Sequence, residues 1–388
     1  MLLQLSDEQR QLQAMIRRVA DERVAPRAAE IDRTAEYPQD MFELLRDLGL
    51  FALPIDPAYG GTGSLVSACL AVEELNRVCY NTAYLLIVQW SAFGGIQSAG
   101  TPEQKAKLLP GLADGSIRAS ISVTEPHSGS DVAGMTTRAD RVPGGYKISG
   151  AKVFCTNSTV ADVFIVAAKT DPTKRHAGIS AFILDRDTPG FTIGKPEDKM
   201  GARGIPSCPL YFDGAFVPEE NRLGAEGAGF RAVMDAFNHG RPIMGARGVG
   251  LAQGAMELAA RFVEERQAFG QKVAQFQGVQ WMIADMAIQI EAARGLVYRA
   301  ASLADRGVVG KELAMAAAMA KCFATDTAMK VATDAVQLWG SNGISRANPV
   351  ERYFRDAKVL QIIEGTNQIQ RNLIGRWTLE GLASMKLI

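Results

Sequence analysis

Near the end of the chain a carboxylate is followed at once by a glycine and then by small polar residues, Glu364-Gly365-Thr366-Asn367. Glycine lets the backbone approach a ligand closely, and Thr366 and Asn367 are good N-caps for a helix that begins there. An acid on a turn above a helix N-terminus is placed to act as a base beside a cofactor. The alternative is an ordinary solvated acid at a helix start, the usual setting of a carboxylate.

A second candidate stretch runs from Val123 through Thr124 to Asp131 and contains Gly129 and Ser130. It leaves an expected strand and enters a loop rich in glycine and serine, where backbone N–H groups can cradle a phosphate and Thr124 offers a hydroxyl. An ordinary connecting loop is the alternative. The stretch is not a G-x-G-x-x-G turn between a strand and a helix, so a Rossmann site is not indicated.

The stretch from Lys152 to Asn157 reads as the end of another strand and includes Phe154, Cys155 and Thr156. Phe154 and Thr156 are two apart, so in a strand they point to the same face. Both could then line one wall of a site for a flat ligand. The alternative is that Phe154 is a core residue.

Other polar residues give weaker signals. Arg266, at the end of a long helical pattern, is suited to pair with a phosphate, but a solvated cation at a helix C-terminus explains it equally well. His239 has no metal-ligand spacing to His127 or His176, so no metal site is expected. No G-x-S-x-G elbow is present.

The elements that must position these residues fall into three blocks, which predict a multidomain α+β protein that is mainly α. Residues 1–118 predict an N-terminal helical domain, with capping-box patterns at Ser6 and Thr101. Residues 119–228 predict a compact β domain, sandwich or barrel, because short β-branched or aromatic runs alternate with turn residues. Residues 229–388 predict a C-terminal helical bundle, whose first helix carries a run of glycines that suggests close approach of another helix or of a cofactor. The expected strands are 118–123, 145–149, 163–169, 179–184 and 210–217, and the expected bundle helices are 232–267, 276–306, 311–339, 349–359 and 367–379.

Composition limits the class of protein. The chain has 388 residues, 47% hydrophobic and 22% charged, with zero formal net charge. Nucleic acid and anionic membranes reward a basic surface, so neither is expected as the main partner. The opening residues show no signal peptide, and no apolar run approaches the ~20 residues that span a bilayer. Five widely spaced cysteines without a C-x-x-C favour a reducing, cytoplasmic setting.

Taken in order, four motifs make the chain resemble the acyl-CoA dehydrogenase family along its whole length. The loop at 123–131 resembles the T-E-P-x-x-G-S-D signature, and Gln337-Leu338-Trp339-Gly340-Ser341-Asn342-Gly343 resembles Q-x-x-G-G-x-G. The stretches at 352–358 and 363–371 resemble an R-D block followed by E-G-T-x-x-I-Q. The family fold is an N-terminal helical domain, a middle β domain and a C-terminal four-helix bundle, assembled as a tetramer or a dimer.

The resemblance implies an FAD enzyme of the kind used in fatty-acid β-oxidation. Glu364 matches the base that removes the α-proton of an acyl-CoA thioester, while the β-hydride goes to N5 of FAD and a trans-2-enoyl-CoA is formed. The backbone N–H of the same Glu364 helps to stabilise the thioester oxygen as charge develops. Burial beside flavin and acyl chain should raise the pKa of Glu364 towards working pH. The implied electron acceptor is an electron-transfer flavoprotein, and the implied assembly is a homo-oligomer, with a tetramer expected.

The other implied site residues bind FAD or CoA. The FAD contacts matched by this sequence are Val123, Thr124, Gly129, Ser130, Phe154, Cys155, Thr156, Arg266, Ala268, Phe269, Gln337, Gly340, Ser341, Thr366 and Gln368, those from Arg266 to Ser341 reaching the FAD of a neighbouring subunit. The substrate contacts are Ser130, Asn238, Arg241, Gly365, Arg376 and, in the acyl pocket, Tyr84.

Departures from the family pattern refine these expectations. Phe154 stands where Trp is common, and Ser341 replaces the second glycine of its motif. Gly240 stands where some relatives keep their base, which strengthens Glu364 in that role. Bulky Tyr84 and Trp90 suggest a short, branched or cyclic acyl group, unless both rings pack away from the site. An acyl-CoA oxidase, a desulfinase of the same fold, or a non-catalytic ligand-binding or scaffold subunit are the alternatives.

Overall fold

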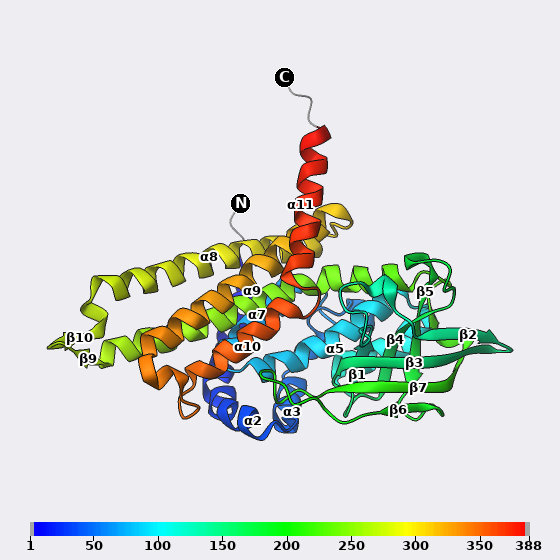
Figure 1. The fold of residues 1–388 in the computed structure, drawn as a ribbon, viewed down its shortest axis with the longest axis horizontal. Helices are drawn as coiled ribbons and strands as arrows, with labels where there is room; N and C mark the ends of the chain where they lie inside the picture. Colours follow the sequence, from blue (N-terminus) through cyan, green and yellow to red (C-terminus); the bar gives the residue numbers. More distant parts are fainter. Residues whose placement is uncertain (1–3, 385–388) are drawn as a thin grey trace.

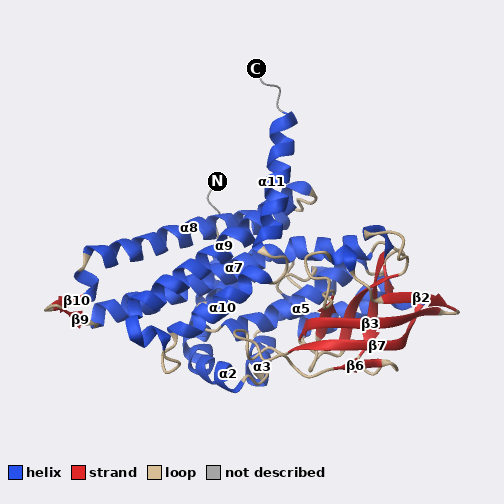
Figure 2. Cartoon of the chain, in the orientation of Figure 1, coloured by secondary structure: helices blue, strands red, loops and turns tan. Residues whose placement is uncertain are grey.

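The structure is a computed structural model that describes residues 4–384. The expectation of no signal peptide rests partly on residues 1–3, which lie outside this range. Helices form a long bundle at one side and a sheet lies at the other, with the N-terminal helices packed along the bundle (Figures 1 and 2). Mainly helical architecture with a middle β domain is confirmed.

The N-terminal part is helical, as expected. Ser6 and Gln9 exchange hydrogen bonds at the start of the first helix, and Thr101 and Gln104 do the same at the sixth, so both predicted capping boxes are confirmed. The helices are α1 (Asp7–Val19), α2 (Ala28–Thr34), α3 (Gln39–Asp47), α4 (Leu65–Asn76), α5 (Tyr80–Ala99) and α6 (Pro102–Asp114). Every described residue of α4 is buried, and so are most residues of α5, which makes these two helices part of the main core.

The middle part is one eight-stranded sheet. Its order is β6-β7-β3-β2-β4-β5-β8, with β1 pairing in parallel with β4. All five expected strands are present, although β3 and β7 are longer than predicted. The strands β2, β6 and β8 were not predicted; β2 reads Arg-Ala-Asp-Arg-Val and buries only its alanine, so it lacks an apolar alternation. The strands are β1 (Ala119–Ser122), β2 (Arg138–Val142), β3 (Gly145–Thr156), β4 (Val163–Lys169), β5 (Ile179–Asp185), β6 (Phe191–Ile193), β7 (Ser207–Pro218) and β8 (Arg222–Leu223).

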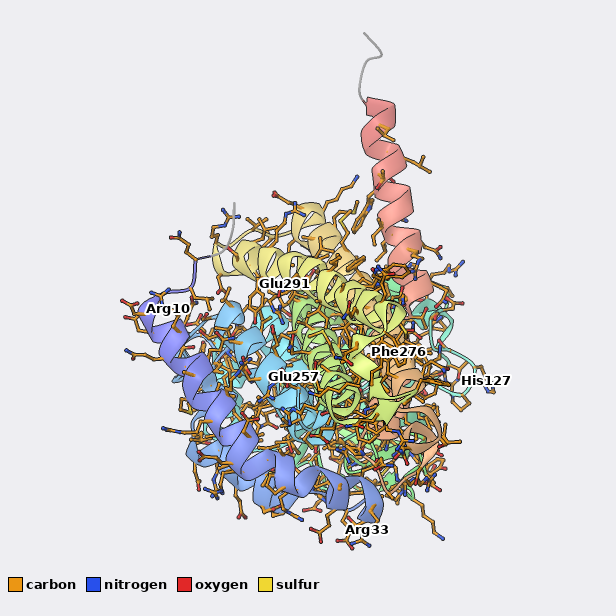
Figure 3. All side chains as sticks on the ribbon, turned by 90° about the vertical axis from the view of Figure 1, so that its left-hand side faces the viewer. Arg10, Arg33, His127, Glu257, Phe276 and Glu291 are labelled. Carbon is orange, nitrogen blue, oxygen red and sulfur yellow. The ribbon has the colours of Figure 1, made fainter. Side chains whose placement is uncertain are left out.

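Between residues 229 and 384 the structure describes five α-helices, close to their predicted limits. They are α7 (Gly229–Glu265), α8 (Gln277–Asp305), α9 (Lys311–Trp339), α10 (Val350–Ile362) and α11 (Asn367–Ser384). A small hairpin of β9 (Gln267–Ala268) and β10 (Gln271–Lys272) joins α7 to α8 at the far tip of the bundle (Figure 1). The helix α11 projects away from the body in both views (Figures 1 and 3).

The glycine run of α7 explains how closely its neighbours pack. A Cβ atom added to Gly245 would lie 2.6 Å from a Val297 methyl group, and one added to Gly248 would lie 2.6 Å from the Ala324 carbonyl oxygen. The same addition at Gly250 or Gly254 would come within 2.2 or 1.9 Å of a carbonyl oxygen in the α4 region. The expected close approach is therefore helix on helix, with α8 and α9 on one side and α4 on another.

None of the helices in the described range is long and apolar enough to cross a membrane.

Candidate active site

Glu364 lies on the turn between α10 and α11, in a conformation that few residues other than glycine adopt. Its φ is +53°, and that of Gly365 is +90°. Two consecutive left-handed residues fold the chain back sharply, and a non-glycine residue held there stores strain of the kind found at functional sites. A Cβ atom on Gly365 would also lie 2.6 Å from Nε2 of Gln370. The φ of Gly365 favours glycine at this position, and a larger residue would also displace the end of the Gln370 side chain.

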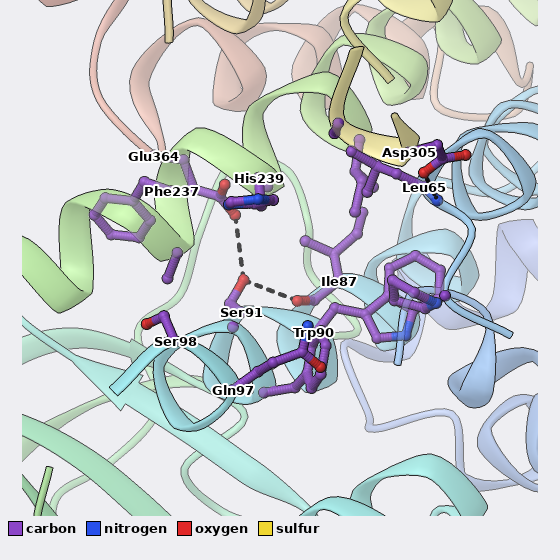
Figure 4. Close-up of a pocket in the computed structure, with 18 residues that line it drawn as sticks. Leu65, Ile87, Trp90, Ser91, Gln97, Ser98, Phe237, His239, Asp305 and Glu364 are labelled. Carbon is purple, nitrogen blue, oxygen red and sulfur yellow. Dashed lines mark hydrogen bonds between the residues drawn. The ribbon is translucent and has the colours of Figure 1, made fainter. Parts of the chain in front are cut away.

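The carboxylate of Glu364 faces a cavity of about 330 Å³, called here the central cavity. One wall comes from α5, with Ile87, Trp90 and Ser91, and the opposite wall from α7, with Phe237 and Gly240 (Figure 4). The size is at the lower end of the range for small-molecule sites. The remaining lining residues are Pro54, Gly63, Leu65, Phe93, Gly94, Gln97, Ser98, Ala236, His239, Ile243, Ala304 and Asp305.

One end of the central cavity is closed by Asp305, at the end of α8. Its carboxylate accepts hydrogen bonds from the backbone N–H groups of Leu65 and Val66, at 2.6 and 3.1 Å, and from the hydroxyl of Ser64 at 3.1 Å. An anion at a helix N-terminus is stabilised by the free N–H groups there. Asp305 therefore ties α8 to the first turn of α4 and fixes this end of the cavity.

Glu364 is an acid with a perturbed affinity for protons. Burial raises the pKa of its carboxyl group, and the positive charges of Arg247, Lys321 and Arg241 oppose this shift without cancelling it. The hydroxyl of Ser91 lies 3.5 Å from Oε1 and 2.8 Å from the carbonyl oxygen of Ile87, so its one proton has a closer acceptor than Glu364 (Figure 4). Within residues 4–384 no cation lies at salt-bridge distance from Glu364. Such a carboxylate keeps its lone pairs free to accept a proton.

The loop that contains Thr124, Gly129 and Ser130 is shaped from within by a buried ion pair. Nζ of Lys152 lies 2.8 Å from Oε1 of Glu125, and Glu125 also accepts the backbone N–H groups of Thr136 and Thr137. Burial opposes ionisation of Glu125, but Lys152 and these donors lower its pKa to about 2. The pair holds the base of the loop and leaves Gly129 and Ser130 exposed at its tip.

The end of β3 lies beside this loop. The N–H of Val153 donates to the carbonyl of Thr124 at 2.9 Å, so the structure brings the two predicted FAD-binding stretches together. Phe154 is not a core residue: 59% of it is exposed, and its φ is +54° because a bulge interrupts the pairing of β3 with β7 there. Cys155 is buried, while Thr156 is half-buried.

These residues fit a flat aromatic cofactor with a phosphate group. Phe154 presents an exposed ring beside the loop, which is available to pack against a flat ring system. A Cβ atom added to Gly129 meets nothing within 4 Å, so this chain itself leaves open space at that glycine. The hydroxyl of Ser122, at the end of β1, is buried without a hydrogen-bond partner.

A second set of predicted FAD contacts lies elsewhere. Arg266, Ala268 and Phe269 are on or beside the β9–β10 hairpin, and Gln337, Gly340 and Ser341 follow at the end of α9. The hairpin is at the opposite end of the molecule from the sheet (Figure 1), and Phe269 is 97% exposed. Within one chain, these six residues therefore lie far from Glu364. This is the arrangement expected if they contact the FAD of a neighbouring copy.

The predicted substrate contacts are also spread over several elements. Asn238 and Arg241 meet on α7, where Nη1 of Arg241 donates to Oδ1 of Asn238 at 2.6 Å. Arg376 is exposed on the projecting α11. Tyr84 is outside the cavity lining; its ring packs 4.0 Å from the guanidinium of Arg247. The bulk that limits the cavity on α5 comes from Trp90 and Phe93 instead.

Thr366 and Gln368 stand at the start of α11. The hydroxyl of Thr366 accepts the N–H of Ile369 at 3.3 Å, so it caps this helix as expected. Gln368 is exposed. Both remain predicted FAD contacts.

Three residues beside Glu364 were missed by sequence reasoning. Ser91 lies on an apolar helix, Arg247 lies among small residues of α7, and Lys321 lies among alanines of α9. Each is a polar residue in an otherwise apolar stretch, which is the signal that could have found them. His127 is at the rim of the molecule (Figure 3), away from His239 in the cavity wall. No group of three or more metal-ligating side chains is found in the part of the chain that the structure describes.

A helical domain, a sheet and a bundle arranged around a partly buried acid define a class of three-domain oxidoreductases. Residues 6–116 match the family model for the acyl-CoA dehydrogenase N-terminal domain, residues 120–215 that for the middle domain, and residues 227–379 that for the C-terminal domain. The chain belongs to the acyl-CoA dehydrogenase family.

Curated relatives match over nearly the whole chain. An acyl-CoA dehydrogenase of Bacillus subtilis is 43% identical over 382 residues, covering 98% of this chain and 100% of the relative. A cyclohex-1-ene-1-carbonyl-CoA dehydrogenase of Geobacter metallireducens is 44% identical over 374 residues, covering 96% of this chain and 98% of the relative.

Solved structures agree with the fold. The butyryl-CoA dehydrogenase of Megasphaera elsdenii is 38% identical, with a TM-score of 0.94 over 98% of this chain and 100% of that one. A chain from a study of the electron transferring flavoprotein of Acidaminococcus fermentans is 40% identical, with the same TM-score and coverage. The FAD complex of PigA is 29% identical, with a TM-score of 0.92 over 99% of this chain and 100% of that one.

Proposed function

We propose that this protein is an FAD-dependent dehydrogenase that converts an acyl-CoA thioester to its trans-2-enoyl-CoA, with Glu364 as the base for the α-proton. The observation that carries the proposal is the carboxylate of Glu364, which faces the central cavity with a raised pKa and, among residues 4–384, has no cation at salt-bridge distance. Family membership supports the reaction class, and the FAD complex among the similar structures supports the cofactor.

In this proposal the protein residues divide the work. Glu364 takes the α-proton, and its own backbone N–H stabilises the thioester oxygen as negative charge develops. FAD, when bound, supplies the two-electron acceptor for the hydride from the β-carbon. The loop around Thr124 to Ser130 and the β3 residues Phe154 to Thr156 hold the cofactor against the cavity. The walls exclude water, which strengthens these electrostatic interactions.

The size of the central cavity favours a small acyl group. Trp90 lines it, and the indole N–H is fixed by a hydrogen bond of 2.8 Å to the carbonyl of Phe51. A fixed ring of this size limits the depth available to a straight chain. A short, branched or cyclic acyl group is therefore the proposed substrate, and relatives named for butyryl-CoA and for cyclohexene-carbonyl-CoA support this range.

The proposal extends to partners and organisation. An electron-transfer flavoprotein is the proposed electron acceptor, supported by the similar chain from the Acidaminococcus study. A homo-oligomer, proposed as a tetramer, would bring the exposed Phe269 hairpin to the cofactor of a neighbouring copy. The domain limits at residues 118/119 and 228/229 stay predictions.

Anaerobic mixing with a panel of acyl-CoA thioesters tests the reaction. Purified protein should be yellow, and a true substrate should bleach the flavin absorbance. Glu364→Gln should still bind FAD and acyl-CoA but should not bleach, whereas Glu312→Gln, at an exposed position of α9, should bleach like the parent protein. A colourless protein that takes up no FAD, or rapid bleaching by Glu364→Gln, would overturn the proposal.

Aerobic turnover separates the alternative reactions of this fold. A dehydrogenase should reduce a dye acceptor and form little hydrogen peroxide. Abundant hydrogen peroxide would instead identify an oxidase.

A further inference from the structure

Lys321 of α9 is a fully buried cation directly beneath the turn that carries Glu364. Its side chain has 0% exposure. The ammonium group donates to the backbone carbonyl of Gly365 at 2.9 Å and to Oδ1 of Asn367 at 2.8 Å. Both acceptors belong to the three residues that follow Glu364. Lys321 therefore holds the turn by hydrogen bonds and does not contact the carboxylate.

Neighbouring groups on α9 and α11 add further hydrogen bonds to this turn. The side-chain amide of Asn367 donates to Thr325 Oγ1 at 2.9 Å and to Asp326 Oδ1 at 2.7 Å. The carbonyl of Gly365 also accepts from Nε2 of Gln370 at 3.2 Å. The left-handed turn is thus held by α9 and by the first turn of α11, and Lys321 is the member of this network that brings a positive charge.

The charge of Lys321 acts on Glu364 through space. Burial lowers the pKa of Lys321 to about 8, while the carboxylates of Glu364 and Asp326 and the thiol of Cys322 oppose this and Arg241 adds to it. No carboxylate lies at salt-bridge distance from Lys321 within residues 4–384. A buried cation that is not neutralised by a contact pair exerts its field on the nearest acid.

The other cations near Glu364 are also bound to other groups. The guanidinium of Arg247 packs over the rings of Tyr80 and Tyr84, 4.2 and 4.0 Å from their centroids, and Arg241 donates to Asn238. The carboxylate therefore experiences three positive charges, yet its only hydrogen-bond partner among the described side chains is Ser91. A direct ion pair would stabilise the carboxylate and occupy the lone pairs that must receive a proton.

We propose that Lys321 is the positioning residue of this site: its ammonium group fixes the Glu364–Gly365 turn and supplies a positive charge that keeps the carboxylate ionised without touching it. The inference rests on the proposed function of Glu364 as base. The proposed role is more than a structural connection between α9 and α11, because a neutral hydrogen-bond donor would be enough to connect the two helices.

The pH dependence of flavin reduction by acyl-CoA, measured anaerobically, separates the two roles. Lys321→Met removes the charge and fills a similar volume. The acidic limb of the profile, where the rate falls because Glu364 becomes protonated, should therefore move to higher pH. The shift should be roughly 1–2 pH units, the size of a cation–carboxylate interaction at a protein-like effective dielectric constant. Lys321→Arg keeps the charge and should keep the limb near its parent position. Thr325→Val is the matched control: it removes a neutral contact to Asn367, so the maximal rate should fall modestly and the limb should stay in place.

Amide hydrogen exchange gives a readout that does not depend on turnover. The peptide that contains Gly365 and Asn367 should exchange faster in Lys321→Met than in the parent protein, with peptides of the sheet unchanged. Should Lys321→Met not fold, Lys321→Gln removes the charge while keeping a hydrogen-bond donor, so it carries the same expectation for the pH dependence of flavin reduction.

The outcomes distinguish this inference from the proposed function. A lower maximal rate of Lys321→Met with an unmoved acidic limb would overturn the role of the charge. Unchanged hydrogen exchange in the Gly365 peptide would refute the claim that Lys321 stabilises the Glu364–Gly365 turn. If no acyl-CoA reduced the flavin of the parent protein, the proposed function would fail, while the exchange experiment would still test Lys321.

Discussion

A Cβ atom added to Gly240 would lie 3.3 Å from Oε2 of Glu364. The bare backbone of α7 at this point therefore faces the proposed base across the central cavity. Since 3.3 Å is tighter than ordinary contact, a methyl group there would push against the carboxylate. Glycine at position 240 leaves the carboxylate room to turn towards a substrate.

Gly240→Ala should separate stability from turnover. Alanine favours a helix over glycine by about 1 kcal/mol, so the thermal midpoint should stay the same or rise. The rate of flavin reduction should fall by about tenfold, which corresponds to ~1.4 kcal/mol of barrier. Gly295→Ala on α8 is the control, because its added Cβ meets nothing within 4 Å. Equal rates for Gly240→Ala and the parent would show that the methyl group is accommodated.

The pH profile of the parent protein should show the raised pKa of Glu364. A base acts only when it is ionised, so the rate of flavin reduction should fall as pH falls through this pKa. Burial makes the loss begin at higher pH than for an ordinary glutamate, whose pKa is about 4.3. Stopped-flow reduction between pH 5 and 9 would measure it, and a rate that is flat down to pH 5 would contradict a raised pKa.

Trp90 should set the acyl length that the protein accepts. Trp90→Ala would deepen the central cavity, so kcat/KM should rise for longer acyl-CoA thioesters and fall for short ones. The same change should destabilise the fold by about 3–5 kcal/mol, as expected for a large buried ring. Trp90→Phe keeps most of the ring and should retain the short-chain preference. If kcat/KM depended on acyl length in the same way for Trp90→Ala and Trp90→Phe, residues other than Trp90 would set the acyl length.

Much of this architecture was predictable from local signals, and the unpredicted parts have physical reasons. The capping boxes at Ser6 and Thr101 and the long periodic helices depend on residues close in sequence, so their positions were nearly correct. The strand β2 buries only Ala139 of its five residues, and its charged pattern resembles a loop. Only tertiary packing brings the charges of Lys321 and Arg247 near Glu364, and single-sequence periodicity does not describe such packing.

Asp356 should make the stability of the protein depend on pH. Burial raises the pKa of this carboxyl to about 7, although the N–H of Ala202 and two arginines oppose the shift. The folded-state pKa exceeds the unfolded value of about 3.9, so this contribution to stability is complete below about pH 4 and is lost as pH rises through 7. Asp356→Asn keeps a carbonyl acceptor for Ala202 and removes the charge.

Denaturant unfolding of Asp356→Asn at several pH values measures this effect. The variant should lose less stability than the parent between pH 4 and 8, by on the order of a few kcal/mol at ~1.4 kcal/mol per pKa unit. Asp326→Asn is a useful contrast, since the pKa of Asp326 is lowered and its change should destabilise at neutral pH. Parallel curves for the parent and Asp356→Asn would argue against a proton on Asp356.

Phe269 tests the proposed contact between copies of the chain. The side chain is almost fully exposed at the hairpin tip, so Phe269→Ser should leave the fold of one chain intact. If the ring serves a neighbouring copy, the variant should lose FAD more readily and should show a smaller mass by light scattering. Trp281→Ser, at another exposed apolar position on α8, shows whether any such loss is specific to the hairpin. Unchanged mass and FAD content for Phe269→Ser would exclude the hairpin from assembly.

The glycines of α7 also limit how this gene can change. Any single-nucleotide missense change of a glycine codon adds at least a Cβ atom, and at positions 245, 248, 250 and 254 that atom would collide with a neighbouring helix or its connection. These four codons should therefore be depleted of missense variants in a functional library. The exposed Gly278 and Gly295 of α8, where a Cβ has open space, should accept alanine freely. Depletion of variants at these four positions would show how closely the helices pack around α7, and the experiment would not require a known substrate.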